Sequence, residues 1–93
     1  VEAVNPAEGQ RIDKWLTYAR FAKTRTVAQA LVEGGKVRIN RDKVTDCARK
    51  VRQDDILTIR AVRQVHVVRV IGFAPARVSP SLTATLYERV ADA

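Results

Sequence analysis

The chain has little of what most catalytic and metal-binding sites require. Its 93 residues include one cysteine, Cys47, and one histidine, His66. One cysteine cannot form an intrachain disulfide, which fits a reducing compartment. A single Cys with a single His also falls short of the four ligands of a structural zinc site. Because His66 lies in an alternating, valine-rich stretch, a structural or exposed role is favoured over a catalytic one. We therefore expect a protein that is not an enzyme and uses no cofactor or metal.

Long apolar runs and phosphate-binding loops are also missing. Crossing a bilayer takes about 20 consecutive apolar residues, whereas the longest candidate, 70–76, is short and contains Pro75. Residues 1–10 carry acids and lack the apolar core of a secretory signal. Gly34 and Gly35 lack the spacing and the following Lys-Ser/Thr of a phosphate loop. These absences predict a cytoplasmic protein that does not interact with membranes.

Acidic residues are in the minority. Seventeen Lys and Arg face ten Asp and Glu, a formal net charge of +7. Such a balance favours a polyanionic partner, chiefly nucleic acid or an anionic membrane surface. The length fits one domain with a modest core. Few glycines and prolines, with 46% hydrophobic residues, argue against disorder except at the ends.

Two helices are predicted after a loose arm at residues 1–10. Helical spacing of Ile12, Trp15, Leu16 and Ala19 predicts the first helix over 11–21, with Trp15 in the core. Thr24 is a suitable cap for a second helix over 25–33, which Gly34-Gly35 would end. Its expected buried face is Val27, Ala28 and Leu31, and its opposite face is Arg25, Gln29 and Glu33. The short joint between the helices predicts a tight hairpin or corner.

The periodicity then changes to that of strands. Residues 36–40 alternate, 40–43 read as a turn, and Val44 starts a short return strand. Residues 56–60 and 65–71 predict an antiparallel hairpin. A last helix is expected to start near Ser79-Pro80, with an apolar stripe made of Leu82, Leu86, Tyr87 and Val90.

Basic residues cluster around the second helix. Arg11 and Lys14 belong to the first helix, and Lys23 and Arg25 flank the start of the second. The residues that follow its end are Lys36, Arg38, Arg41 and Lys43. If the helices pack closely, these side chains converge on one surface beside Tyr18, and amides at Arg25 and Thr26 favour a phosphate. Asp13 could pair with a basic neighbour, and Asp54-Asp55 reads as part of a turn.

Several motifs, in order, resemble the S-four RNA-binding domain. They are RIDKWL at 11–16, KTRTVAQALVEGGKVRIN at 23–40 and DILTI at 55–59. The match is most similar to the ribosome-associated fifteen-kilodalton heat-shock protein family, and it extends more weakly through 77–88. The resemblance implies an α+β fold, with two N-terminal helices packed on a small antiparallel sheet in an L shape. It also implies an RNA-binding domain at 11–73, followed by a helical extension at 74–93.

The resemblance further implies that structured RNA binds across the two helices and the following strand. Arg11 and Lys14 match its opening motif, and Thr24, Arg25 and Thr26 match its helix start. Lys36, Val37, Arg38 and Asn40 match its strand. The predicted RNA-binding set is completed by Lys23, Gln29, Arg41 and Lys43. The partner implied by the heat-shock relatives is the large ribosomal subunit, in rescue or recycling, and we expect the chain to be a monomer.

The sequence departs from that family in three places. The sequence stops at Ala93, so the long basic tail of those relatives is absent or was removed. The N-terminal arm is longer than usual, and Asp54 stands where the domain usually has glycine. Two alternatives stay open at this point. The domain also occurs as an appendage of pseudouridine synthases, RNA methyltransferases and a tRNA synthetase. A protein–protein module that uses Leu82, Leu86 and Val90 is the other alternative.

Overall fold

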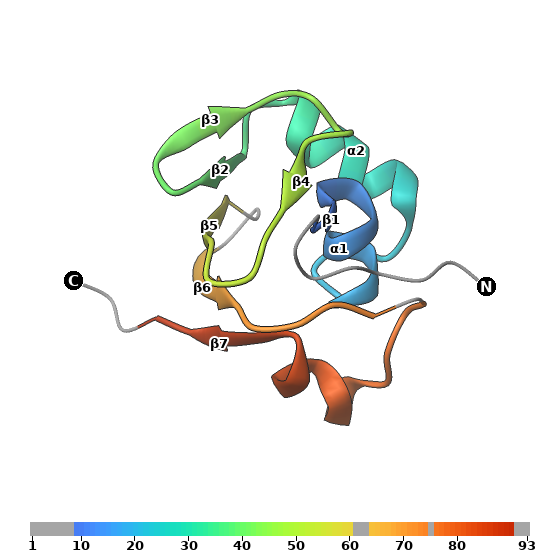
Figure 1. Ribbon diagram of the computed structural model, residues 1–93. Helices are drawn as coiled ribbons and strands as arrows, with labels where there is room; N and C mark the ends of the chain where they lie inside the picture. The colour runs from blue at the N-terminus through green and yellow to red at the C-terminus, as the bar shows by residue number, and fades with distance from the viewer. Residues whose placement is uncertain (1–8, 61–63, 75, 91–93) are drawn as a thin grey trace.

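The computed structural model describes residues 9–60, 64–74 and 76–90, and it combines helices with antiparallel strands (Figure 1). Helices α1 (Ile12–Tyr18) and α2 (Arg25–Glu33) lie together at one side. The main sheet has the order β3-β2-β5-β6-β7, and its strands are β2 (Val37–Ile39), β3 (Asp42–Val44), β5 (Ile56–Arg60), β6 (Val65–Val70) and β7 (Tyr87–Arg89). A separate pair joins β1 (Gln10–Arg11) to β4 (Lys50–Val51). The predicted α+β fold, with two N-terminal helices against an antiparallel sheet, is confirmed.

Helix α1 is shorter than the predicted 11–21. Its apolar stripe behaves as expected, because Ile12, Trp15 and Leu16 are all fully buried. The helix ends at Tyr18 because Arg20 takes a φ of 68°, a left-handed conformation that cannot continue a right-handed helix. The Trp15 indole Nε1 donates to the Gly72 carbonyl at 3.1 Å, which ties α1 to the segment after β6.

Helix α2 has the predicted bounds, and two of the three residues of its predicted buried face, Ala28 and Leu31, pack in or against the core. The Thr24 hydroxyl accepts a hydrogen bond from the Val27 amide at 3.2 Å, as a cap should. Val27, expected in the core, is 44% exposed, whereas Ala28 and Val32 are fully buried. The helix is turned so that Arg25 and Gln29, predicted to face solvent together, reach Asp13 on α1.

The inner face of the sheet supplies most of the remaining core. Ile39 pairs with Leu57, which pairs with Val68, so these three side chains form one buried row across three strands. Val37 and Ile59 form a second row. Burying a Val, Leu or Ile side chain contributes about 1.5–3 kcal/mol, so these rows hold the sheet against the helices.

Two turns use side chains with left-handed backbone conformations. Asn40 and Arg41, with φ of 55° and 96°, connect β2 and β3 in the manner of a type I′ hairpin turn. Asp54 has a φ of 72°, and its amide donates to the Val70 carbonyl at 2.7 Å. The turn therefore takes a glycine-like conformation although aspartate occupies the position.

The C-terminal segment is only partly the predicted helix. A 3₁₀ helix, η1 (Pro80–Thr85), begins where expected, but Tyr87–Arg89 is strand β7 on the edge of β6. Unpaired strand edges carry unsatisfied donors and acceptors, and β7 satisfies those of β6. Gly72 permits the close approach, because a Cβ there would lie 2.5 Å from the Thr85 carbonyl oxygen. The expected apolar stripe therefore does not exist, and Leu86 is buried while Leu82 is 51% exposed.

The expected loose arm can be followed only at its end. Residues 1–8 lie outside the described residues, as do 61–63, 75 and 91–93. Gln10 is not loose, because it pairs with Val51 and its side chain donates to the Ala74 carbonyl at 2.9 Å.

Candidate nucleic-acid interface

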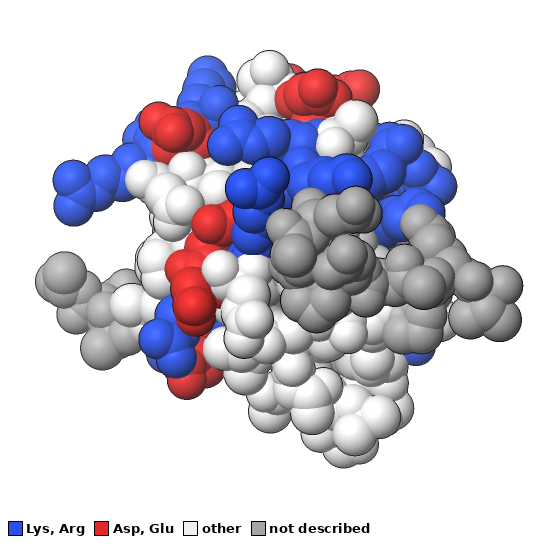
Figure 2. All heavy atoms as spheres, viewed as in Figure 1, with Lys and Arg blue, Asp and Glu red and all other residues white. Residues whose placement is uncertain are grey.

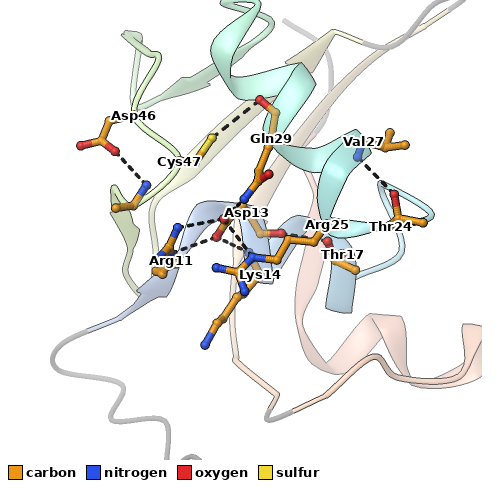
Figure 3. Close-up of polar contacts among 11 residues, drawn as sticks. Arg11, Asp13, Lys14, Thr17, Thr24, Arg25, Val27, Gln29, Asp46 and Cys47 are labelled. Atoms are coloured by element: carbon orange, nitrogen blue, oxygen red, sulfur yellow. Dashed lines mark hydrogen bonds and ion pairs between the residues drawn. The ribbon is translucent and has the colours of Figure 1, made fainter.

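A buried aspartate joins the two helices at the centre of the predicted interface (Figure 3). The Asp13 side chain is fully buried. The Arg11 guanidinium binds both of its oxygens, through Nε at 3.2 Å and Nη2 at 3.0 Å. From α2, Arg25 Nε and Gln29 Nε2 each donate to Oδ2 at 3.2 Å. One carboxylate on α1 therefore links the preceding residue Arg11 to two side chains of α2.

The charge of Asp13 is itself stabilised by these contacts. Burial of the carboxyl would raise its pKa, but hydrogen bonds from Arg11, Gln29, Arg25 and the Lys14 amide outweigh this and hold the pKa below its usual value. The carboxylate therefore stays ionised at neutral pH. Since two guanidiniums surround one carboxylate, the cluster keeps an excess of positive charge.

Both guanidiniums remain accessible on their outer sides. The Arg11 side chain is 38% exposed and that of Arg25 is 47% exposed. Arg25 meets Asp13 through Nε (Figure 3), which leaves its Nη groups for other contacts. A guanidinium has five N–H donors, so one that is oriented by a carboxylate can still bind a phosphate oxygen.

The β1–β4 pair extends the basic surface with residues outside the predicted set. Arg11 lies directly opposite Lys50, and the Ile12 amide donates to the Arg49 carbonyl at 2.8 Å. Lys50 and Arg49 are both exposed. The sequence indicates a basic segment here, but it carries no signal for this two-residue pairing. Arg49, Lys50 and Arg52 also line a surface cavity of about 350 Å³ between β4 and the β2–β3 turn.

Another basic group lies at the joint between the helices. Lys23 and Thr26 are exposed beside the capping residue Thr24. Arg77 Nη1 donates to the Lys23 carbonyl at 3.0 Å, and the Val78 amide donates to the Tyr18 carbonyl at 3.2 Å. Arg77 was not predicted, since it lies 54 residues from Lys23 along the chain.

Among the predicted strand residues, the basic side chains are exposed. Arg38 lies opposite Lys43 on the outer face of the β2–β3 hairpin, and Lys36 and Arg41 are exposed at its two ends. Lys43 lies across Gly35, where a Cβ would come within 2.3 Å of its Cε atom, so it reaches the C-terminal end of α2.

Two predicted strand residues have structural roles. Val37 is fully buried and pairs on both sides, with Val44 and Ile59, so it supports the sheet and its side chain cannot contact RNA. Asn40 is exposed, but its amide nitrogen donates to Asp55 Oδ1 at 3.0 Å and its Oδ1 accepts from the Ile56 amide at 2.9 Å. Its side chain is therefore already engaged in holding the β2–β3 turn.

The charged side chains are distributed unevenly over the surface. Figure 2 shows many Lys and Arg across the upper half of the view, with some Asp and Glu among them, whereas the lower part around η1 is largely uncharged. Among the described residues, no group of three or more His, Cys, Asp or Glu could hold a metal ion. Within the same residues, no helix is both long and apolar enough to span a membrane.

Comparison with known proteins agrees with this architecture. The model of the S4 domain family matches residues 10–57, more than half of the chain. The chain therefore belongs to the S4 domain family. Its relatives include proteins named heat shock protein 15.

These relatives match over most of the chain. Heat shock protein 15 of Escherichia coli K12 is 38% identical over 87 residues, which cover 94% of this chain and 65% of that protein. The homolog from Aeromonas salmonicida is 37% identical and is also covered to 65%. The chain thus spans just under two thirds of the length of these curated relatives. A solved structure, described as the trimeric structure of Vibrio cholerae heat shock protein 15, is similar with a TM-score of 0.82 and 32% identity, covering 87% of this chain and 81% of that one.

Proposed function

We propose that this chain binds structured RNA and catalyses no reaction. The observation that carries the proposal is the Asp13 cluster, in which one buried carboxylate binds the guanidinium of Arg11, the N-cap residue of α1, and that of Arg25 on α2. Preorganised Arg side chains bind phosphate at a lower entropic cost than flexible ones. Further positive charge comes from Lys50, which lies opposite Arg11, and from Lys14, Lys23 and Arg49, which are close along the chain to Asp13, Arg25 and Lys50.

Recognition of RNA shape follows from the kind of side chains on this surface. Arg and Lys on helices and a rigid hairpin bind phosphates and report backbone geometry, which is how double-stranded RNA is mostly recognised. The exposed strand residues Arg38 and Lys43 would bind a neighbouring part of the same RNA. Trp15 is fully buried and takes no part in stacking, while Tyr18 is partly exposed beside the surface.

We further propose large-subunit ribosomal RNA as the target, with a role in ribosome rescue or the heat-shock response. The similarity to proteins named heat shock protein 15 supports this choice over an appendage of an RNA-modifying enzyme. Crosslinking in cells, followed by sequencing of the attached RNA, tests it. Recovery of large-subunit rRNA is the expected result, and recovery of tRNA alone would contradict it.

Binding itself is tested by titrating a folded RNA hairpin at several salt concentrations. If about six phosphates are contacted, the logarithm of the affinity should fall with the logarithm of salt with a slope of about −4 to −5. An affinity that is independent of salt would exclude the basic surface as the binding site.

Self-association is part of the same proposal. The Vibrio cholerae relative is described as trimeric, which argues against the expected monomer. Exposed apolar side chains at Val65, Leu82 and Val90 are available for such contacts. Light scattering at micromolar concentration should report three times the mass of one chain. A mass of one chain at every concentration would show that the protein is a monomer, as the sequence predicts.

A further inference from the structure

A second site is built from rings and guanidiniums where the end of α1 meets β6 and β7. A surface cavity of about 250 Å³ lies there. It is lined by Arg20, Phe21, His66, Thr83, Tyr87 and Arg89, among others. Among the described residues that line it, none is acidic. The two arginines therefore give the cavity an uncompensated positive charge.

Three aromatic rings form the wall of this cavity. The rings of Phe21 and Tyr87 have centroids 4.7 Å apart, and those of Phe21 and His66 are 5.5 Å apart. Trp15 packs behind them, with its centroid 5.9 Å from that of Phe21. Because Trp15 is fully buried, it holds Phe21 in place from the core side. The aromatic wall is therefore packed directly against the core.

The polar groups of the cavity are also oriented. Arg89 Nη1 lies 3.1 Å from His66 Nδ1. A guanidinium can only donate, so Nδ1 accepts, and the neutral ring carries its proton on Nε2. Burial and the charge of Arg89 lower the pKa of His66, which keeps the ring neutral at pH 7. Arg20 is held by its own bond from Nη1 to the Val78 carbonyl at 3.2 Å.

An aromatic wall beside two arginines suits a ligand in which a planar ring is joined to a phosphate. We propose that the cavity takes a single unpaired nucleotide of the bound RNA, with the base against Phe21 and Tyr87 and its phosphate on Arg20 and Arg89. The inference rests on the proposed RNA binding. The volume is below the about 300–1,000 Å³ of sites that enclose whole small molecules, so it suits one base at the surface better than a free nucleoside triphosphate.

The position of the cavity is compatible with one RNA reaching both sites. Asp13 is at the start of α1, and Arg20 and Phe21 follow its end. Seven helical residues span about 10 Å, a distance of a few nucleotides. A stem on the basic surface could therefore place a bulged or terminal nucleotide in the cavity.

The experiment compares two RNA hairpins with the same stem, one fully paired and one with a single bulged 4-thiouridine. The native protein should bind the bulged hairpin about tenfold more tightly, within the range measured for stacking one base on an aromatic side chain. Arg89→Gln should remove this difference and leave affinity for the paired hairpin nearly unchanged. Arg69→Gln is the control for loss of one arginine from the same sheet, because Arg69 is next to Val68, the partner of Arg89, and so points to the other face, where it pairs with Glu88.

Two direct measurements on the native protein avoid any dependence on variants. Irradiation of the bulged complex should crosslink 4-thiouridine to Phe21 or Tyr87, and the His66 ring resonance should shift with the bulged hairpin but not with the paired one.

Equal affinity for both hairpins with a crosslink elsewhere would overturn the cavity assignment and leave the proposed function intact. Failure of both hairpins to bind would overturn the proposed function itself. Free UMP that binds as tightly as the bulged hairpin would make a mononucleotide the ligand and overturn the RNA assignment.

Discussion

Arg25 on α2 donates from Nε to Asp13 Oδ2 on α1 at 3.2 Å, and this contact joins the two helices at the surface proposed to bind RNA. Arg11, the N-cap residue of α1, forms an ion pair with the same carboxylate. Because the Asp13 carboxylate is buried and the two arginine side chains are partly exposed, this cluster of three residues has two effects. It orients donors for phosphate, and it fixes the angle at which the helices present them.

Asp13→Asn gives the sharpest test of this arrangement. The substitution makes the surface more positive, so simple electrostatics predicts tighter RNA binding. We expect weaker binding instead, because Arg11 and Arg25 lose their shared anchor. The free energy of unfolding should fall by about 1–3 kcal/mol, the cost of losing charged hydrogen bonds to a buried group. Hairpin titration and urea denaturation measure the two effects, and a gain in affinity would contradict the anchoring role.

Arg25→Ala should weaken RNA binding about tenfold, or about 1.4 kcal/mol, without unfolding the domain. The loss of stability should be at most about 1 kcal/mol, because the Arg25 side chain is nearly half exposed. Arg25→Lys should recover only part of the affinity, since an ammonium cannot bind a carboxylate and a phosphate in the planar geometry of a guanidinium. Circular dichroism confirms folding. Full affinity in a folded Arg25→Ala protein would remove this residue from the site.

Acid should destabilise the protein through Asp13. Its pKa in the folded state is below the ordinary 3.8, so the unfolded chain binds the proton more readily. The stabilisation is present above about pH 3.8 and is lost as the pH falls through the folded-state value. Urea denaturation between pH 2 and 6 should show this loss. Asp13→Asn should reduce it, and an unchanged acid dependence in that variant would assign the effect to other carboxylates.

Lys50→Gln tests the extension of the interface along β4. Lys50 is exposed opposite Arg11, so its charge should contribute to binding but little to folding. We expect weaker RNA binding and a salt dependence whose slope is smaller by about one, with unchanged stability. Arg69→Gln removes a charge from β6 and provides the comparison. Equal effects of the two variants would mean that only net charge matters.

Asn40→Gly separates a structural role from RNA contact. Glycine accepts the φ of 55° at this position, so the turn is not strained, but the bonds to Asp55 and Ile56 are lost. Each such bond contributes about 0.5–1.5 kcal/mol, and stability should fall accordingly. The slope of the salt dependence should stay the same. A normal stability with reduced affinity would return Asn40 to the set of RNA contacts.

Local sequence signals predicted the helical region well. Thr24 and Gly34-Gly35 marked the limits of α2, and the spacing of Ile12, Trp15 and Leu16 identified the buried side of α1. The same kind of signal misled in two places. The apolar spacing predicts Val27 in the core, but Val27 is exposed. Spacing alone does not specify how a helix is rotated about its axis. The apolar stripe predicts that Leu86 and Tyr87 are helical, but Tyr87 begins strand β7. The stripe carries no information about the free edge of β6, with which β7 pairs.

The sequence by itself determined the strong positive charge, the limits of α2 and the presence of basic residues in separate segments. Those properties depend on composition and on neighbours a few residues apart. Only the tertiary structure decided that Asp13 is the common anchor of Arg11 and Arg25, that Lys50 lies beside Arg11, and that His66 meets Arg89. Contacts of this kind depend on how helices turn and on how strands pair, and both follow from packing over the whole core rather than from local preference.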